Sequence, residues 1–141
     1  MDVATVKTYS IKEVTKLTGT AASTLRYYED LGLLENVERD HNDNRIYTDE
    51  HLARIDGIKC FKDGAMPLDK IKKFYAYEAD LENHIDDILN LVTSQTEELS
   101  ETIAKMLKQK EHMQQKVCFY SAIKKAIDNK TPWPSWDDCI K

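Results

Sequence analysis

A heptad pattern in the second half of the chain most constrains the fold. Apolar residues recur there with alternating spacings of four and three, which places them along one stripe of a helix. This stripe, the heptad seam, has ten positions of which eight are apolar: Ile85, Leu89, Val92, Thr96, Leu99, Ile103, Met106, Lys110, Met113 and Val117. At about 1.5 Å per residue the seam extends roughly 50 Å, too long for one small domain to cover. We therefore expect a long helix from Leu81 that pairs with a partner.

Residues 10–20 predict a short helix followed by a glycine turn. Ser10-Ile11-Lys12-Glu13 is a capping box, because the serine oxygen can accept from a free amide while the glutamate reaches back to the serine amide. Ile11, Val14 and Leu17 then mark one apolar face. Gly19 can adopt the left-handed conformation that ends a helix. A second helix after this turn would complete a helix-turn-helix.

The second helix is predicted around Thr24-Leu25-Arg26-Tyr27-Tyr28-Glu29 and ends at Gly32. Leu25 and Tyr28 fall on one stripe, so we assign Tyr28 to the core. The other faces carry Ser23, Arg26, Tyr27 and Asp30. An exposed arginine beside a tyrosine suits contact with phosphates and base edges in a nucleic acid groove. This is the pattern of a recognition helix.

A β-hairpin is predicted after the recognition helix. An extended segment begins at Leu33, residues 40–44 form a polar turn, and Arg45-Ile46-Tyr47 leads back. Such a hairpin would be a wing, with Arg39 and Arg45 flanking its tip.

The ordered residues from Tyr9 to Tyr47 resemble the DNA-binding head of the MerR family of bacterial transcription regulators. The resemblance is carried, in order, by Ser10-Ile11-Lys12-Glu13-Val14, Gly19, Ser23-Thr24-Leu25-Arg26-Tyr27-Tyr28-Glu29, Gly32-Leu33, Arg39, Asn42, Arg45 and Tyr47. It covers about half of the chain well and continues more loosely to Phe74. A helix-turn-helix alone is a weak signal, whereas this set includes a wing.

The resemblance implies a mainly α fold with a winged helix-turn-helix head, a small β-hairpin wing, a long dimerisation helix and a short C-terminal tail. The corresponding domains would be residues 8–76, 81–117 and 118–141. The long helix would form an antiparallel coiled coil between two copies and place two heads on a two-fold operator. The heptad pattern alone does not fix this orientation or self-pairing.

The family pattern also implies a set of DNA-contacting residues. These would be Ser10, Lys12, Thr20, Ser23, Thr24, Arg26, Tyr27, Arg39, Asn42, Arg45 and Tyr47. The chain departs from the family at two places. Asn42-Asp43 stands where Asn-Gly is usual at the wing tip, and Ala21-Ala22 stands where Ser-Pro often precedes the recognition helix. We expect Thr20 to cap that helix instead.

The net charge of the chain leaves open an alternative to DNA contact for the arginines of the head. The net charge is −5, whereas DNA-binding domains are usually basic. Residues 1–75 hold 12 basic and 13 acidic side chains, so DNA contact requires the basic ones to gather on one side. The alternative is that Arg26, Arg39 and Arg45 only form surface ion pairs, with Glu29, Glu38 or Asp43 as partners.

The remaining segments predict three more helices. One begins after Thr48 as N-cap and ends at Gly64, and a second opens at Pro67 with an apolar face that completes the head. After the heptad seam, residues 119–127 predict a short helix, followed by an aromatic end with Trp133 and Trp136. We expect these aromatic side chains to pack back on the coiled coil or on the partner's head; a tryptophan-lined ligand pocket is the alternative.

The three cysteines bear on the signal that the protein senses. Cys118 and Cys139 are 21 positions apart with no close pairing in sequence, which argues against a soft-metal or iron-sulfur site, and the odd count favours reduced thiols. Cys60 lies in a segment similar to a subgroup of the family whose single cysteine responds to aldehydes, nitrosative stress or other electrophiles. Lys59 or Lys62 would favour its thiolate. The alternative is an inert, buried packing thiol.

These patterns predict a homodimeric transcription regulator that binds a pseudo-palindromic promoter. By resemblance it would distort the promoter spacer and so act on RNA polymerase indirectly, through shared double-stranded DNA. We expect no cofactor, no metal and no enzymatic activity, because no cluster of nucleophile, base and orienting group is evident. No apolar run reaches the length of a membrane span, so we expect a cytoplasmic protein. Alternatives are a coiled-coil adaptor that binds protein and a DNA-architectural factor similar to an excisionase.

Overall fold

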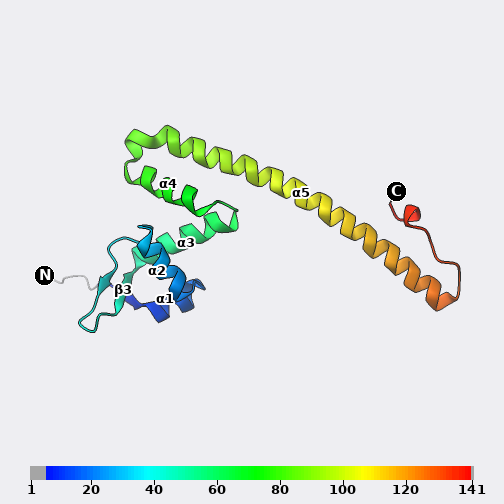
Figure 1. Cartoon of the computed structure of the whole chain (residues 1–141), viewed down its shortest axis with the longest axis horizontal. Helices are drawn as coiled ribbons and strands as arrows, with labels where there is room; N and C mark the ends of the chain where they lie inside the picture. The colour runs from blue at the N-terminus through cyan, green and yellow to red at the C-terminus, as the bar shows by residue number, and fades with distance from the viewer. Residues whose placement is uncertain (1–5, 141) are drawn as a thin grey trace. The chain divides into compact units, whose positions relative to one another are not determined.

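The computed structural model describes residues 6–140, which form helices and one small sheet. The chain divides into two compact units, one on each side of the Thr93–Ser94 bond. Residues 6–93 hold strands β1, β2 and β3, helices α1 to α4 and the start of α5 (Figure 1). The rest of α5 and the tail make up the second unit. Both the predicted winged helix-turn-helix head and the predicted long helix are confirmed.

Helix α1 spans Ile11–Thr18 and begins as the sequence predicts. The backbone N–H of Glu13 donates to Ser10 Oγ at 3.1 Å, and the Ser10 N–H donates to Glu13 Oε1 at 3.1 Å. Gly19 ends the helix in the left-handed conformation with a φ of 70°, and its N–H donates to the Thr15 carbonyl oxygen. The capping box and the glycine turn are thus both present.

Helix α2 spans Ala22–Asp30 and starts without a side-chain cap. The prediction that Thr20 caps this helix is wrong, because the N-cap position is occupied by Ala21. The N–H of Thr20 instead donates to Thr18 Oγ1 at 3.2 Å, within the turn. At the other end, Gly32 has a φ of 78°, which turns the chain toward the wing.

The wing belongs to a three-stranded antiparallel sheet in the order β1-β3-β2. Strand β1 is Thr8–Ser10, β2 is Glu38–Arg39 and β3 is Arg45–Thr48. The hairpin of β2 and β3 confirms the prediction, with Arg39 opposite Arg45. The sequence analysis did not predict β1, which pairs with β3 in the register Tyr9 to Tyr47. This pairing attaches the wing to the residues that cap α1.

Helices α3 (Asp49–Asp63) and α4 (Leu68–Ala79) complete the head. The side chain of His51 is buried, and its Nδ1 accepts from the Thr48 N–H at 2.9 Å. Its Nε2 lies 2.7 Å from the Glu35 carbonyl oxygen, so the imidazole joins the start of α3 to the segment that follows α2. The sequence analysis missed this residue, whose only signal is its position three residues after the N-cap.

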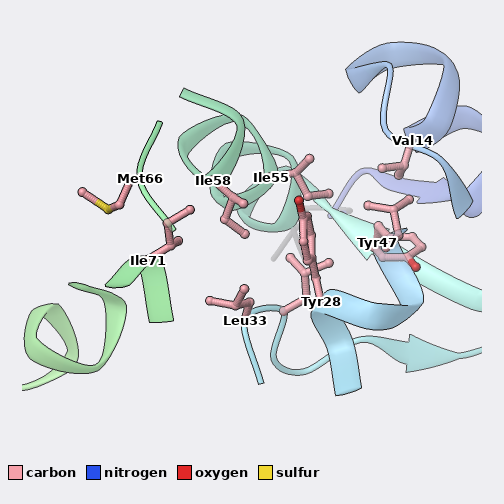
Figure 2. Packing of buried hydrophobic residues seen from close by; sticks show 10 residues of the cluster. Val14, Tyr28, Leu33, Tyr47, Ile55, Ile58, Met66 and Ile71 are labelled. Carbon is pink, nitrogen blue, oxygen red and sulfur yellow. The ribbon is translucent and has the colours of Figure 1, made fainter. Parts of the chain in front are cut away.

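The core of the head draws one or two side chains from each of α1, α2, β3, α3 and α4, together with residues of the segments after α2 and before α4 (Figure 2). Its buried apolar residues are Val14, Leu25, Tyr28, Leu33, Leu34, Tyr47, Ile55, Ile58, Met66 and Ile71. In Figure 2 the Tyr28 side chain reaches toward Ile55 of α3, and Tyr47 lies on the side of the cluster nearer to Val14 of α1. Because α1, α2, β3 and α3 share these contacts, burial of one apolar cluster fixes the recognition helix relative to the wing.

Helix α5 spans Leu81–Asn129, with non-helical backbone angles at His84. It is longer than the seam, because residues 118–129 continue the same helix where the sequence predicts a separate short one. Apolar seam positions are exposed along its length, including Leu89, Ile103 and Met113. No helix in residues 6–140 combines the length and apolar character needed to cross a membrane.

The tail after α5 returns to that helix within the second unit. A 3-10 helix, η1, spans Trp136–Asp138, and the Trp136 ring lies 5.4 Å from the Phe119 ring, centroid to centroid. The prediction that the tail aromatics pack back on the long helix is confirmed for Trp136. Trp133 differs, because 65% of its surface is exposed.

Candidate nucleic-acid interface

The outer face of α2 carries the side chains that the sequence analysis assigned to it. Ser23, Arg26, Tyr27 and Asp30 are exposed, whereas Leu25 and Tyr28 are buried. Thr24 is half-buried. The prediction that Tyr28 is buried and Tyr27 is exposed is therefore correct. Tyr28 lies three positions after the buried Leu25, and residues three apart share a face of a helix.

A cleft of about 440 Å³ lies between α1, α2 and the wing. Lys12, Arg26 and Arg45 line it, so the structure brings together three of the predicted contact residues from three elements. Ser10 also lines it, with its Oγ already engaged by the Glu13 amide. Exposed side chains on α1 and α2 beside a wing form a surface that a duplex backbone can follow.

Acidic side chains in the same cleft are held by local partners. Asp40 Oδ1 accepts from the backbone N–H groups of Asn42 and Asn44, each at 2.9 Å. These hydrogen bonds, that of Asn44 first, lower the pKa of Asp40, so its carboxylate serves the wing turn. Glu13 is used by the capping box. Within residues 6–140 Arg26 has no ion pair, which leaves its guanidinium available to an external anion.

Arg45 and Arg39 adopt the ion pairs that the sequence analysis raised as an alternative. Arg45 Nε lies 2.6 Å from Glu29 Oε2, with both side chains largely buried. At the wing, Arg39 donates to the Asp43 carbonyl oxygen at 3.2 Å and lies 3.5 Å from its carboxylate. Because the Arg39 and Asp43 side chains are more exposed, water weakens that pair far more.

The prediction that Tyr47 contacts DNA is wrong. Its relative exposure is 0%, and its hydroxyl is buried with no hydrogen-bond partner among the described residues. The ring packs edge-on against His51 at 5.7 Å. A side chain enclosed in this way has no surface to offer DNA, so Tyr47 belongs to the core. Of the other predicted residues, Asn42 is exposed at the wing tip and Thr20 is half-buried beside the turn.

Comparison with known proteins identifies this architecture. The family model for MerR HTH regulatory proteins matches residues 9–78. A helix-turn-helix transcriptional regulator of Haemophilus influenzae is 32% identical over 117 residues, which are 83% of this chain and 87% of that protein. This chain belongs to the MerR family.

Two solved MerR structures match most of the chain. HiNmlR, a MerR family regulator lacking the sensor domain and bound to promoter DNA, has a TM-score of 0.77 at 28% identity; the match covers 96% of this chain and 97% of that one. A MerR family regulator from Bacillus thuringiensis has a TM-score of 0.66 at 29% identity, covering 79% of this chain and 98% of that one.

One departure from the MerR pattern has a clear structural consequence. Asp43 stands where the family usually has glycine, and it has a φ of 63°. The wing therefore retains the left-handed turn position, with a residue that tolerates it better than most. The exchange also places the carboxylate that pairs with Arg39 at the wing tip.

Cys60 is exposed on α3, so the alternative of a buried packing thiol is wrong. It lines a cleft of about 590 Å³ with Phe61, Phe74 and Tyr75. Lys62, which the sequence analysis placed near the thiol, instead donates from Nζ to the Tyr28 hydroxyl at 3.2 Å.

The two remaining cysteines lie closer together than their positions in the sequence indicate. They are 21 positions apart, yet the Cys118 side chain raises the pKa of Cys139, so the two thiols are neighbours. The return of the tail along α5 brings them together, and sequence separation gave no signal of it.

Proposed function

We propose that this MerR chain is a transcription regulator that binds double-stranded promoter DNA through the outer face of α2 and the wing. The observation that carries the proposal is the exposed Arg26, which lines the α2–wing cleft without an ion pair among the described residues. Arginine is the side chain best suited to phosphates and to guanine edges. The promoter DNA bound to HiNmlR supports this assignment, because that chain matches almost all of this one.

The functional molecule in this proposal is a homodimer. Seam residues such as Ile103, Met106 and Met113 leave more than half of their apolar surfaces exposed to water. A second copy packed on the seam would bury these surfaces. We propose an antiparallel coiled coil over residues 81–117, between heads formed by residues 8–76 and tails formed by residues 118–141. A two-fold pair of heads would bind a pseudo-palindromic operator.

The regulator would act from the cytoplasm by changing the shape of the promoter spacer. Deforming a duplex consumes free energy that the protein recovers through extra contacts. RNA polymerase would then respond to the altered DNA, without a required direct contact between the two proteins.

Footprinting on the DNA upstream of its own gene tests this function. We expect protection of a two-fold site centred between the two promoter elements, with enhanced cleavage at distorted steps near its centre. Protection outside any spacer would instead favour a DNA-architectural role, and no protection in dilute buffer would favour a protein-binding adaptor.

We further propose that Cys60 receives the signal, as an electrophile-reactive thiol. Its exposure and its place in the cleft between α3 and α4 support access by a small reagent. Transcription from the target promoter under aldehyde or nitrosating challenge should lose its response in Cys60→Ser and keep it in Cys118→Ser. An undiminished response in Cys60→Ser would remove Cys60 from the sensing step.

A further inference from the structure

The end of α5 is built to send the chain back along the helix. Lys130 has a φ of 56°, its N–H donates to the Ile127 carbonyl oxygen, and the Thr131 N–H donates to the Ala126 carbonyl oxygen at 2.9 Å. These two bonds around a left-handed residue form a Schellman motif. Pro132 follows, where a proline prevents the helix from continuing. The reversal is thus specified locally.

Trp136 attaches the returning tail to one face of α5. Its ring lies edge-on to the rings of Phe119 at 5.4 Å and His112 at 6.1 Å, and Lys116 Nζ lies 5.4 Å from its centroid. These three helix positions are spaced by four and three, so they form one stripe. Ser135 and Asp138 close the 3-10 turn through a hydrogen bond from the Ser135 N–H at 2.9 Å.

This packing brings two thiols together at the end of the turn. Cys139 directly follows η1, and Cys118 directly precedes Phe119 on α5. The neighbouring Cys118 side chain raises the pKa of Cys139 to about 11, so the two thiols lie close enough to interact. The Cys139 thiol therefore keeps its proton at neutral pH.

We propose that Cys118 and Cys139 are an oxidation site that forms a reversible intrachain disulfide in response to a hydroperoxide. Cys118 attacks the peroxide, which yields a sulfenic acid on Cys118 and the corresponding alcohol or water. Cys139 then attacks that sulfur; the sulfur–sulfur bond forms, and the sulfenic hydroxyl leaves with the thiol proton as water. Two thiols are oxidised by two electrons while the peroxide bond is reduced.

Cys118, the residue proposed to attack the peroxide, stays accessible in the proposed dimer. Cys118 lies one residue beyond Val117, the last seam position, and so about 100° away around the helix. Its side chain is exposed. The site is independent of Cys60, which lies in the other unit, and its test does not involve DNA.

Peptide mass spectrometry of the full, reduced protein treated with hydrogen peroxide tests the proposal. After free thiols are blocked with iodoacetamide, trypsin should release residues 117–124 linked to residues 131–141, with a mass about 2 Da below the sum of the two peptides. Dithiothreitol should restore both free peptides. On a non-reducing denaturing gel the oxidised chain should remain a monomer.

Serine variants separate this pair from other thiol chemistry. Cys60→Ser should form the cross-link to the same extent as the natural chain, and both Cys118→Ser and Cys139→Ser should lose it entirely. Dimedone should trap a sulfenic acid on Cys118 in Cys139→Ser. Two results would overturn the proposal: alkylated Cys118 and Cys139 peptides after peroxide treatment, or a cross-link that joins two chains. Dimedone labelling confined to Cys139 would overturn the assigned order of attack.

Discussion

Arg45 Nε lies 2.6 Å from Glu29 Oε2, and this single ion pair joins the wing strand β3 to the recognition helix α2. The two residues are 16 positions apart in the sequence, so the ion pair is a long-range contact between two separate elements. The hydrogen bond that Arg45 donates to the Glu29 carboxylate raises the pKa of Arg45. We infer that Arg45 positions the wing relative to α2, while Arg26 offers its charge to DNA.

Glu29→Gln should therefore destabilise the head. The amide keeps a hydrogen-bond acceptor but leaves the largely buried guanidinium without a counter-charge, and we expect a loss of about 1–2 kcal/mol in the free energy of unfolding. Urea denaturation measures this loss. Asp43→Asn removes the exposed wing pair and is the matched control, which should unfold like the natural chain. Equal midpoints for the two variants would remove the positioning role from Glu29.

Tyr47→Phe should leave both stability and DNA affinity nearly unchanged. The buried hydroxyl has no hydrogen-bond partner in the described residues, and burying an unpaired hydroxyl costs free energy. Removing it removes this cost, while the ring keeps its packing. We expect the free energy of unfolding to change by no more than about 1 kcal/mol. Operator affinity, measured by fluorescence anisotropy, should also be retained. A large loss of affinity with intact stability would restore Tyr47 to the contact set.

Alkaline pH should destabilise the head, partly through Tyr47 and Tyr75. Burial raises the pKa of both hydroxyls above their ordinary value, so the folded chain binds these protons more tightly than the unfolded chain. Their contribution is complete below a pH of about 10 and is lost as the pH rises through the folded pKa values. Urea denaturation from pH 8 upward, compared at about pH 11, should show a smaller decline in Tyr47→Phe than in the natural chain. Parallel declines would contradict this assignment.

Ile103→Asp should convert the proposed dimer to a monomer. A carboxylate at an exposed seam position would be buried between two copies without a partner. Sedimentation velocity across a dilution series measures the change. Ala104→Asp introduces the same side chain one residue off the seam, at an exposed position, and should remain dimeric. Two variants that dissociate alike, or a natural chain that is monomeric, would contradict pairing through the seam.

The spacing of residues in the sequence predicted the features that depend on contacts within a single helix. The three-residue spacing placed Tyr28 in the core and Tyr27 outside, and the capping box placed the start of α1 at Ser10. Strand β1 was missed because three residues are too few to show alternation. Tyr47 was misassigned for a related reason. The alternation of side chains in the four-residue strand β3 shows which residues share a face. It does not show which of the two faces is covered by another element.

The candidate site could be predicted as a set of residues but not as a set of contacts. Sequence reasoning named Arg26, Arg39 and Arg45 together, whereas the ion pair of Arg45 with Glu29 depends on how the wing lies against α2. The contact between Cys118 and Cys139 likewise depends on a chain reversal at Lys130. Lysine gives little sign of a left-handed residue in sequence, so the point at which the chain reverses could not be foreseen, although the packing of the tail aromatics on the long helix was predicted.

The operator affinity of Arg26→Ala, measured by anisotropy beside that of Lys105→Ala, tests the central claim most directly. Both changes remove one exposed positive charge, but Lys105 belongs to α5 in the second unit and is not among the residues that line the α2–wing cleft. We predict a loss of about 100-fold for Arg26→Ala, because each of two heads loses a DNA contact, with unchanged urea unfolding and with Lys105→Ala at the natural affinity. Equal affinities for both variants and the natural chain would contradict the proposal that α2 reads DNA through Arg26.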